Sequence, residues 1–175
     1  MHLRVATKTD TLALEELIAE SVWQLQAHCY SETQRQAALG TVFGVDSQLI
    51  TDKTYFLIES NHQLVACGGW SYRSTLCGAD AGKVGEEISV NPQTDPARIR
   101  AFFVRPEFAR QGLGTRILLA SEAAAQQKGF RKFELVGTLA GEPLYAKHGY
   151  TAIERYALQL SNGEELPVVR MTKSV

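Results

Sequence analysis

The stretch from Arg98 to Gly129 constrains the fold of this chain more than any other. It opens with a run of aromatic and β-branched residues, passes Pro106 and a Gly-x-Gly at 112–114, and continues with helical periodicity. This pattern predicts a strand, a tight turn and the start of a helix. The first N–H groups of a helix have no partner inside it, and the helix dipole is positive there. The segment is therefore suited to hold an anion such as a phosphate.

The local charge favours the same interpretation. Between 98 and 116 there are five arginines and one acid, Glu107, a local excess of +4 in a chain whose formal net charge is −1. Gly112 and Gly114 lack a Cβ, so we expect them to permit unusual φ values and a close approach of the anion to the backbone. A Gly-x-Gly in this position is also compatible with a plain tight turn, and the motif alone leaves both interpretations open.

The composition indicates one globular domain. A chain of 175 residues can bury a core, and its contents of 45% hydrophobic and 21% charged residues argue against disorder, so we predict a single domain over 1–175. The near-neutral charge argues against a nucleic-acid binder. No apolar run approaches the roughly 20 residues of a membrane span, and the N-terminus lacks an apolar signal core. We therefore predict a cytoplasmic protein.

The cysteines and histidines show no ligand spacing. Cys29, Cys67 and Cys77 are odd in number and form no CxxC pair, and the four histidines are scattered. Neither a disulfide framework nor a zinc site is predicted, and we expect no metal cofactor.

Hydrophobic periodicity predicts the order β-α-α-β-β-β-α-β-α-β-β. We expect strands over 2–7, 55–59, 64–72, 98–104, 131–136, 150–160 and 166–173, and helices over 11–27, from Ser31 to about Phe43, from 113 to about 128, and over 142–148. Two-residue hairpin turns are expected at Asn61-His62 and Asn162-Gly163. The strand–helix–strand unit within 98–136 predicts a parallel pair, and the flanking hairpins predict antiparallel ones. The fold class is thus α/β, a mixed sheet with helices on its faces.

The least regular part of the chain is 73–97, with three glycines, two prolines and little periodicity. Loops of this length in a compact domain are usually functional or mobile. Two interpretations stay open: the loop lies over a substrate site, or it is an inert surface excursion.

Two motifs resemble a known family. FFVRPEFARQGLGTRIL at 102–118 resembles the acetyl-CoA-binding segment of the GNAT superfamily of N-acetyltransferases, and LYAKHGY at 144–150 resembles its C-terminal tyrosine motif. The order of the motifs and of the strands and helices matches this superfamily over nearly the whole chain. The resemblance implies a mostly antiparallel sheet of about seven strands, with a bulge in the fourth strand and a splay between the fourth and fifth.

The resemblance also implies the cofactor-binding residues. Phe102, Phe103 and Val104 match the strand whose backbone pairs with the pantetheine arm of acetyl-CoA and polarises the acetyl oxygen through a main-chain N–H. The loop that holds the pyrophosphate through its N–H groups matches Arg110, Gln111, Gly112, Leu113, Gly114 and Thr115.

Tyr145 matches the tyrosine that protonates the departing thiolate of coenzyme A, although a core aromatic is the structural alternative for this residue. Two positions depart from the pattern. Ala109 stands where many members have Gln or Arg, and Thr138 stands where many have an Asn that contacts the cofactor; a Thr can also form a hydrogen bond there.

The implied reaction moves an acetyl group from acetyl-CoA to an amine by direct attack in a ternary complex, without a covalent acyl-enzyme. The acceptor, a small-molecule amine or a peptide or protein amine, is expected to bind between 24–48 and 71–97. Residues 10–59 carry eight acids and two basic residues, which would steer a cationic acceptor but also fits a solvated helix face. The resemblance leaves a homodimer open, and neither nucleic acid nor a membrane is an expected partner.

The base that deprotonates the amine is left open. An amine with a pKa near 10.4 is almost wholly protonated at neutral pH, so its proton must be removed. The candidates are Glu134 in the fifth strand, Glu86, Glu87, Asp46, Glu142 and His28.

Two other functions are weighed. One is a non-catalytic acyl-CoA-binding module with the same fold. The other is a dinucleotide oxidoreductase, which is disfavoured because Ile117 stands where the third glycine of GxGxxG belongs.

Overall fold

The structure, a computed structural model, describes residues 1–82 and 88–175. Its strands are β1 (His2–Val5), β2 (Tyr55–Ser60), β3 (Gln63–Ser71), β4 (Ala97–Val104), β5 (Lys132–Thr138), β6 (Thr151–Gln159) and β7 (Glu165–Ser174). Its helices are α1 (Thr11–Leu25), α2 (Glu32–Ala38), α3 (Ser47–Thr51), α4 (Leu113–Gln127) and α5 (Glu142–Lys147). The seven strands form one sheet in the order β1-β2-β3-β4-β5-β7-β6, in which β4 and β5 are parallel and all other neighbours antiparallel. The predicted fold class and the parallel pair are confirmed.

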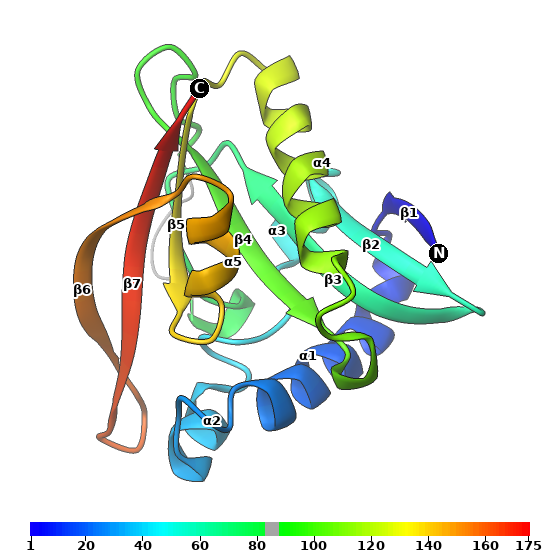
Figure 1. The fold of residues 1–175 in the computed structure, drawn as a ribbon, viewed down its shortest axis with the longest axis vertical. Coiled ribbons are helices and arrows are strands. Elements are labelled where there is room, and N and C mark those ends of the chain that lie inside the picture. Colours follow the sequence, from blue (N-terminus) through cyan, green and yellow to red (C-terminus); the bar gives the residue numbers. More distant parts are fainter. Residues whose placement is uncertain (83–87) are drawn as a thin grey trace.

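The sheet is covered on both faces (Figure 1). Leu14, Leu17 and Ile18 of α1 belong to a buried cluster that includes Phe103 of β4. Ile117 of α4 packs with Phe102, the preceding residue on the same strand. Because successive side chains of a strand point to opposite faces, α1 and α4 cover opposite sides of the sheet.

The segment after α1 differs from the prediction. Ser31 caps α2 in a capping box with Gln34, as expected, but the helix ends at Ala38 instead of about Phe43, because Leu39 is extended and Gly40 has φ +85°. A short helix that was not predicted, α3, begins after Asp46, whose carboxylate accepts hydrogen bonds from the N–H groups of Gln48 and Leu49.

The two hairpin turns also differ from each other. Asn61 and His62 both have positive φ, 49° and 64°, as a two-residue type I′ turn requires, so this prediction is confirmed. At the other hairpin only Gly163 has positive φ, 84°, and Leu160 N–H pairs with the carbonyl of Glu164 across three intervening residues. The prediction of a two-residue turn at Asn162-Gly163 was wrong, because Asn162 does not adopt the left-handed conformation.

The parallel pair is short, and this creates the site. β4 and β5 pair only at Ala97 with Phe133 and at Arg98 with Glu134, and then separate. Glu134 is 4% exposed and forms ion pairs with Arg98 of β4 and Arg170 of β7. This carboxylate therefore holds three strands together at the point where the two parallel strands begin to part.

Among residues 1–82 and 88–175, none of the helices has the length and apolar character that crossing a lipid bilayer requires. The same residues contain no group of three or more His, Cys, Asp or Glu side chains that could hold a metal ion.

Replacing Glu134 tests its role at this junction. We expect Glu134→Ala to lower the free energy of unfolding by about 3–5 kcal/mol, because the buried guanidinium of Arg98 loses its carboxylate. Glu154 pairs with the same Arg170 at 3.5 Å but is 54% exposed, so Glu154→Ala should cost less than about 1 kcal/mol. Urea denaturation measures both, and equal losses would contradict this account.

Candidate functional site

A bulge in β4 shapes the site. Gly69 of β3 pairs with Arg100, and Cys67 of β3 pairs with Phe103. Two residues of β4, Ala101 and Phe102, therefore lie opposite the single residue Gly68 of β3. Ala101 has φ +58°, which is uncommon for any residue with a Cβ. The bulge that the family resemblance implied is therefore present. Bulges of this kind bend a strand and re-aim its backbone groups.

Two buried donors hold the bulge. The hydroxyl of Tyr55 lies 3.3 Å and the thiol of Cys67 lies 3.7 Å from the carbonyl oxygen of Ala101. Burial raises the pKa of the Cys67 thiol to about 12 and raises that of Tyr55 well above its ordinary value, so both groups keep their protons at neutral pH. These hydrogen bonds offset the backbone strain of about 1–3 kcal/mol that a left-handed alanine carries.

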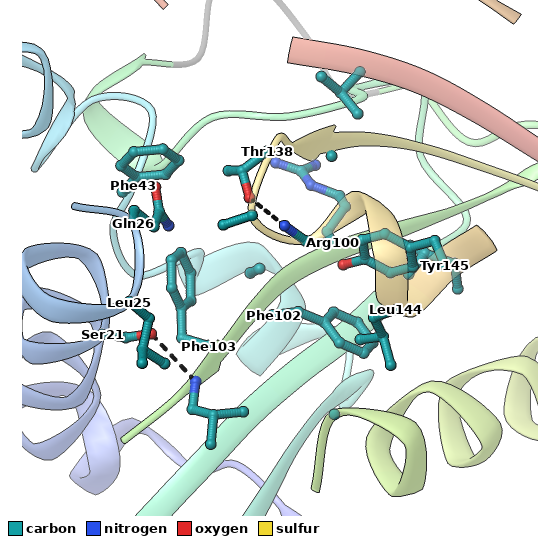
Figure 2. A pocket seen from close by; sticks show the side chains of 18 of the residues that line it. Ser21, Leu25, Gln26, Phe43, Arg100, Phe102, Phe103, Thr138, Leu144 and Tyr145 are labelled. Atoms are coloured by element: carbon teal, nitrogen blue, oxygen red, sulfur yellow. Dashed lines mark hydrogen bonds between the residues drawn. The ribbon is translucent and has the colours of Figure 1, made fainter. Parts of the chain in front are cut away.

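The separation of β4 and β5 opens a cleft with a volume of about 680 Å³. Its walls come from β4, β5, the end of α1, the start of α4, α5 and the segments 42–44 and 76–78. On the α1 side of the cleft, the N–H of Val104 lies 3.4 Å from Ser21 Oγ (Figure 2). This hydrogen bond is long, so a better acceptor can replace it.

The helix start at one end of the cleft has free N–H groups. The first bond of the helix runs from Arg116 N–H to the carbonyl of Gly112, at 3.0 Å, so the N–H groups of residues 113–115 have no acceptor inside the helix. Gly112 and Arg110 both have positive φ, 83° and 63°, and this conformation turns the chain into α4.

The two glycines of this turn serve different purposes. A Cβ on Gly112 would meet nothing within 4 Å, so glycine is favoured there by its left-handed φ alone. Gly114 does not have a positive φ, and a Cβ there would lie 3.0 Å from Leu144. Our expectation that both glycines supply unusual φ values was wrong for Gly114, which allows α4 to pack closely on α5.

The predicted cofactor-binding residues mostly gather at this cleft. Those that line it are Phe102, Phe103, Val104, Arg110, Gly112, Leu113, Gly114, Thr115 and Thr138. Gln111 does not, because its side chain is exposed and donates to the carbonyl of Glu107. Two of the hydroxyls are already engaged: Thr138 Oγ1 accepts from Gly141 N–H at 3.0 Å, and Thr115 Oγ1 lies 3.0 Å from His148 Nε2. Nothing in the sequence pattern pointed to His148.

Tyr145 stands on α5 at the cleft. It is 7% exposed, and its ring packs edge-on against Phe102 and Tyr150, with centroids 6.0 and 5.8 Å apart. The hydroxyl points into the cleft (Figure 2). Burial raises the pKa of the phenol, so it stays protonated at neutral pH and can act as a proton donor.

Arg100 of β4 holds part of the loop 73–97 against the cleft. This buried guanidinium donates to the carbonyls of Thr75 and Gly78 at 3.1 and 2.9 Å, and it pairs with Asp46 at 2.9 Å. These bonds tie the loop to the sheet and place residues 76–78 against the cleft. Of the two interpretations of 73–97, a position over the site fits this part of the loop.

The base candidates are distributed differently from what the sequence suggested. Three of them are engaged in ion pairs. Glu134 pairs with Arg98 and Arg170. Asp46 pairs with Arg100, and Glu142 pairs with Arg155. Within the described residues, His28 is the candidate that lines the cleft, while Glu86 and Glu87 lie outside those residues.

The acids of 10–59 do not form the wall of the cleft in the part of the chain that the structure describes. Five of them pair with arginines instead: Asp10 and Glu59 with Arg4, Glu20 with Arg105, Asp46 with Arg100, and Asp52 with Arg73. The number of acids in 10–59 suggested that they steer a cationic acceptor into the cleft. The described residues that line the cleft give this no support, because none of these acids is among them.

Comparison with known proteins agrees with this geometry. The model of the acetyltransferase (GNAT) family matches residues 19–150. No match was found among curated protein sequences. Among solved structures, a GCN5-related N-acetyltransferase from Rhodopseudomonas palustris has a TM-score of 0.72 at 22% identity, covering 99% of this chain and 95% of that one.

Two further structures share the fold at low identity. The PaiA N-acetyltransferase from Thermoplasma acidophilum, in complex with coenzyme A, has a TM-score of 0.66 at 15% identity and covers 99% of this chain and 98% of its own. The ribosomal-protein-S18-alanine N-acetyltransferase from Escherichia coli has a TM-score of 0.59 at 16% identity, with 99% and 93% covered. At these identities the likeness concerns the fold alone.

Gly112 and Gly163 provide a matched pair for testing the turn. Their φ values are 83° and 84°, and a Cβ on either would meet no atom within 4 Å. Changing either to alanine should therefore cost about 1–2 kcal/mol of stability. We expect only Gly112→Ala to weaken coenzyme A binding in calorimetry, by about tenfold, or 1.4 kcal/mol. Unchanged affinity in Gly112→Ala would contradict a role for this turn in holding the pyrophosphate.

Proposed function

Because this chain belongs to the acetyltransferase (GNAT) family, we propose that it transfers an acetyl group from acetyl-CoA to an amine by direct attack in a ternary complex. The observation that carries the proposal is the cleft between β4 and β5, with a bulged strand on one side and the hydroxyl of Tyr145 on the other. Acetyl-CoA supplies an activated thioester. The protein supplies the groups that bind it, orient it and move protons.

The fit of the cleft to coenzyme A supports the proposal. The free N–H groups of residues 113–115 and the positive end of the α4 dipole suit the pyrophosphate. Arg110 also lines the cleft, as does Lys147, the neighbour of the His148 that contacts Thr115, and both add positive charge. The backbone of Phe102–Val104 would pair with the pantetheine arm, because β5 leaves this edge of β4 unpaired beyond Arg98.

The backbone at the bulge is suited to stabilise charge. As the amine nitrogen bonds to the carbonyl carbon, negative charge builds on the carbonyl oxygen, and an oriented N–H stabilises it at little reorganisation cost. The N–H of Val104 faces the cleft and has only a long hydrogen bond to Ser21. We assign this role to the Phe102–Val104 backbone.

Proton transfer completes the reaction. The carbon–sulfur bond breaks, the thiolate takes a proton from Tyr145, and the amine loses one proton. His28 lines the cleft and is the described candidate for receiving the amine's proton, directly or through water.

A non-catalytic acyl-CoA-binding module is the alternative, and one pair of measurements separates the two. Acetyl-CoA should raise the melting temperature in either case, since any ligand selective for the folded state does so. An enzyme should also release free thiol from acetyl-CoA with at least one member of a broad amine and peptide panel. Stabilisation without thiol release across the panel would favour the binding module, and no stabilisation at millimolar acetyl-CoA would reject both.

Tyr145→Phe tests the proton donor. We expect the turnover number to fall about 100-fold at neutral pH while acetyl-CoA affinity stays within twofold, because only the hydroxyl is lost. Tyr150→Phe is the control: its hydroxyl bonds to buried Glu122 at 2.9 Å and does not line the cleft, so turnover should be kept. An unchanged rate in Tyr145→Phe would remove this residue from the mechanism.

The pH profile of the wild-type protein should rise with pH as the amine loses its proton. Burial raises the pKa of Tyr145 above its ordinary value of about 10, so the acid form is retained throughout the rise. A decline of turnover that begins below pH 9 and disappears in Tyr145→Phe would contradict this.

A further inference from the structure

One buried polar atom in the cleft has no partner. Gln26, which follows the last residue of α1, is 6% exposed, and its Oε1 forms no hydrogen bond within the described part of the protein. Buried polar atoms in folded proteins are almost always paired, because an unpaired one loses its bonds to water without replacement. The free protein therefore carries an unfavourable feature at this position.

The location of Gln26 Oε1 at the cleft suggests a function for this unpaired atom. Within the described part of the chain, further buried atoms without a partner are found in Arg35, Trp70 and Ser121, and none of these three residues lines the cleft. Gln26 does line it, and so does the neighbouring end of α1. The terminal torsion of a glutamine is soft, so its amide can turn toward a ligand that offers a donor.

Apolar side chains form part of the cleft wall near Gln26. Phe43, Val42 and Leu158 line the cleft and belong to one hydrophobic cluster, in which Phe43 packs edge-on against Phe103 with centroids 6.2 Å apart. Figure 2 shows Gln26 beside Phe43, across the cleft from Tyr145. An uncharged hydrogen-bond acceptor thus stands next to an apolar wall.

We propose that the acceptor is a primary amine on an uncharged, apolar body, and that its amino group donates a hydrogen bond to Gln26 Oε1. This inference rests on the proposed acetyl transfer and names the acceptor class for the same site. A neutral primary amine has two N–H donors and one lone pair, so a bond to Gln26 leaves the lone pair free to attack. A carboxylate in this place would instead stabilise the protonated amine, which cannot attack. Phe43 and Leu158 would bury the body of the acceptor.

Gln26→Met separates this role from a structural one, because methionine has a similar shape but no amide. We expect the melting temperature to rise by a few degrees, since an unpaired buried oxygen is removed. At the same time kcat/KM for an apolar amine should fall about tenfold, with the KM for acetyl-CoA unchanged. Gln24→Met, an exposed glutamine near the end of the same helix, should change neither quantity. A lower melting temperature with unchanged acceptor kinetics would overturn the proposal.

A comparison of acceptors tests the apolar wall. With wild-type protein, 2-phenylethylamine should have a kcat/KM at least tenfold above that of the polycation spermidine. Leu158→Glu should reverse this preference, whereas Ile153→Glu, on the same strand but 54% exposed and outside the cleft, should not. Turnover of spermidine but not of 2-phenylethylamine by the wild type would overturn this inference and leave acetyl transfer intact. Stabilisation by acetyl-CoA without thiol release from any amine would overturn both.

Discussion

The site depends on how β4 is held on its two sides. On one side the carbonyl of Ala101 accepts hydrogen bonds from Tyr55 and Cys67, and this stabilises a bulge whose central residue is left-handed. On the other side pairing with β5 stops after Arg98, where Glu134 binds two arginines. Between these two constraints the strand leaves backbone groups facing a cleft. A regular sheet would have paired them with β5.

Most helices and strands could be predicted from the hydrophobic periodicity of the sequence, and the two elements that were missed depend on single residues. Helical and alternating periodicity predicted the order of the strands, four of the helices and the parallel pair, because each of these elements buries one apolar face. α3 was missed because it is too short for periodicity to register, although Asp46 before it is a common capping residue. The turn near Gly163 was assigned the wrong length, because Asn-Gly is compatible with more than one loop.

The site could be predicted only in part. The motif residues 102–104, 110–115 and Tyr145 come together as the family resemblance implied, except that Gln111 points away from the cleft. The role of Gly114 and the ion pairs of Glu134 could not be predicted, because they depend on contacts with distant segments that no short pattern records. Gln26 gave no signal in the sequence, since its significance lies in lacking a partner after the chain has folded.

In the complex that we propose, acetyl-CoA binds between β4 and β5, with its pyrophosphate at the start of α4 and its thioester at the bulge. Amide hydrogen exchange followed by NMR, with and without saturating acetyl-CoA, tests it directly. The account predicts slower exchange at Val104 and at residues 113–115, with no change in the distant turn at Gly163. Binding of acetyl-CoA that leaves these amides unchanged, or that protects a different surface, would contradict it.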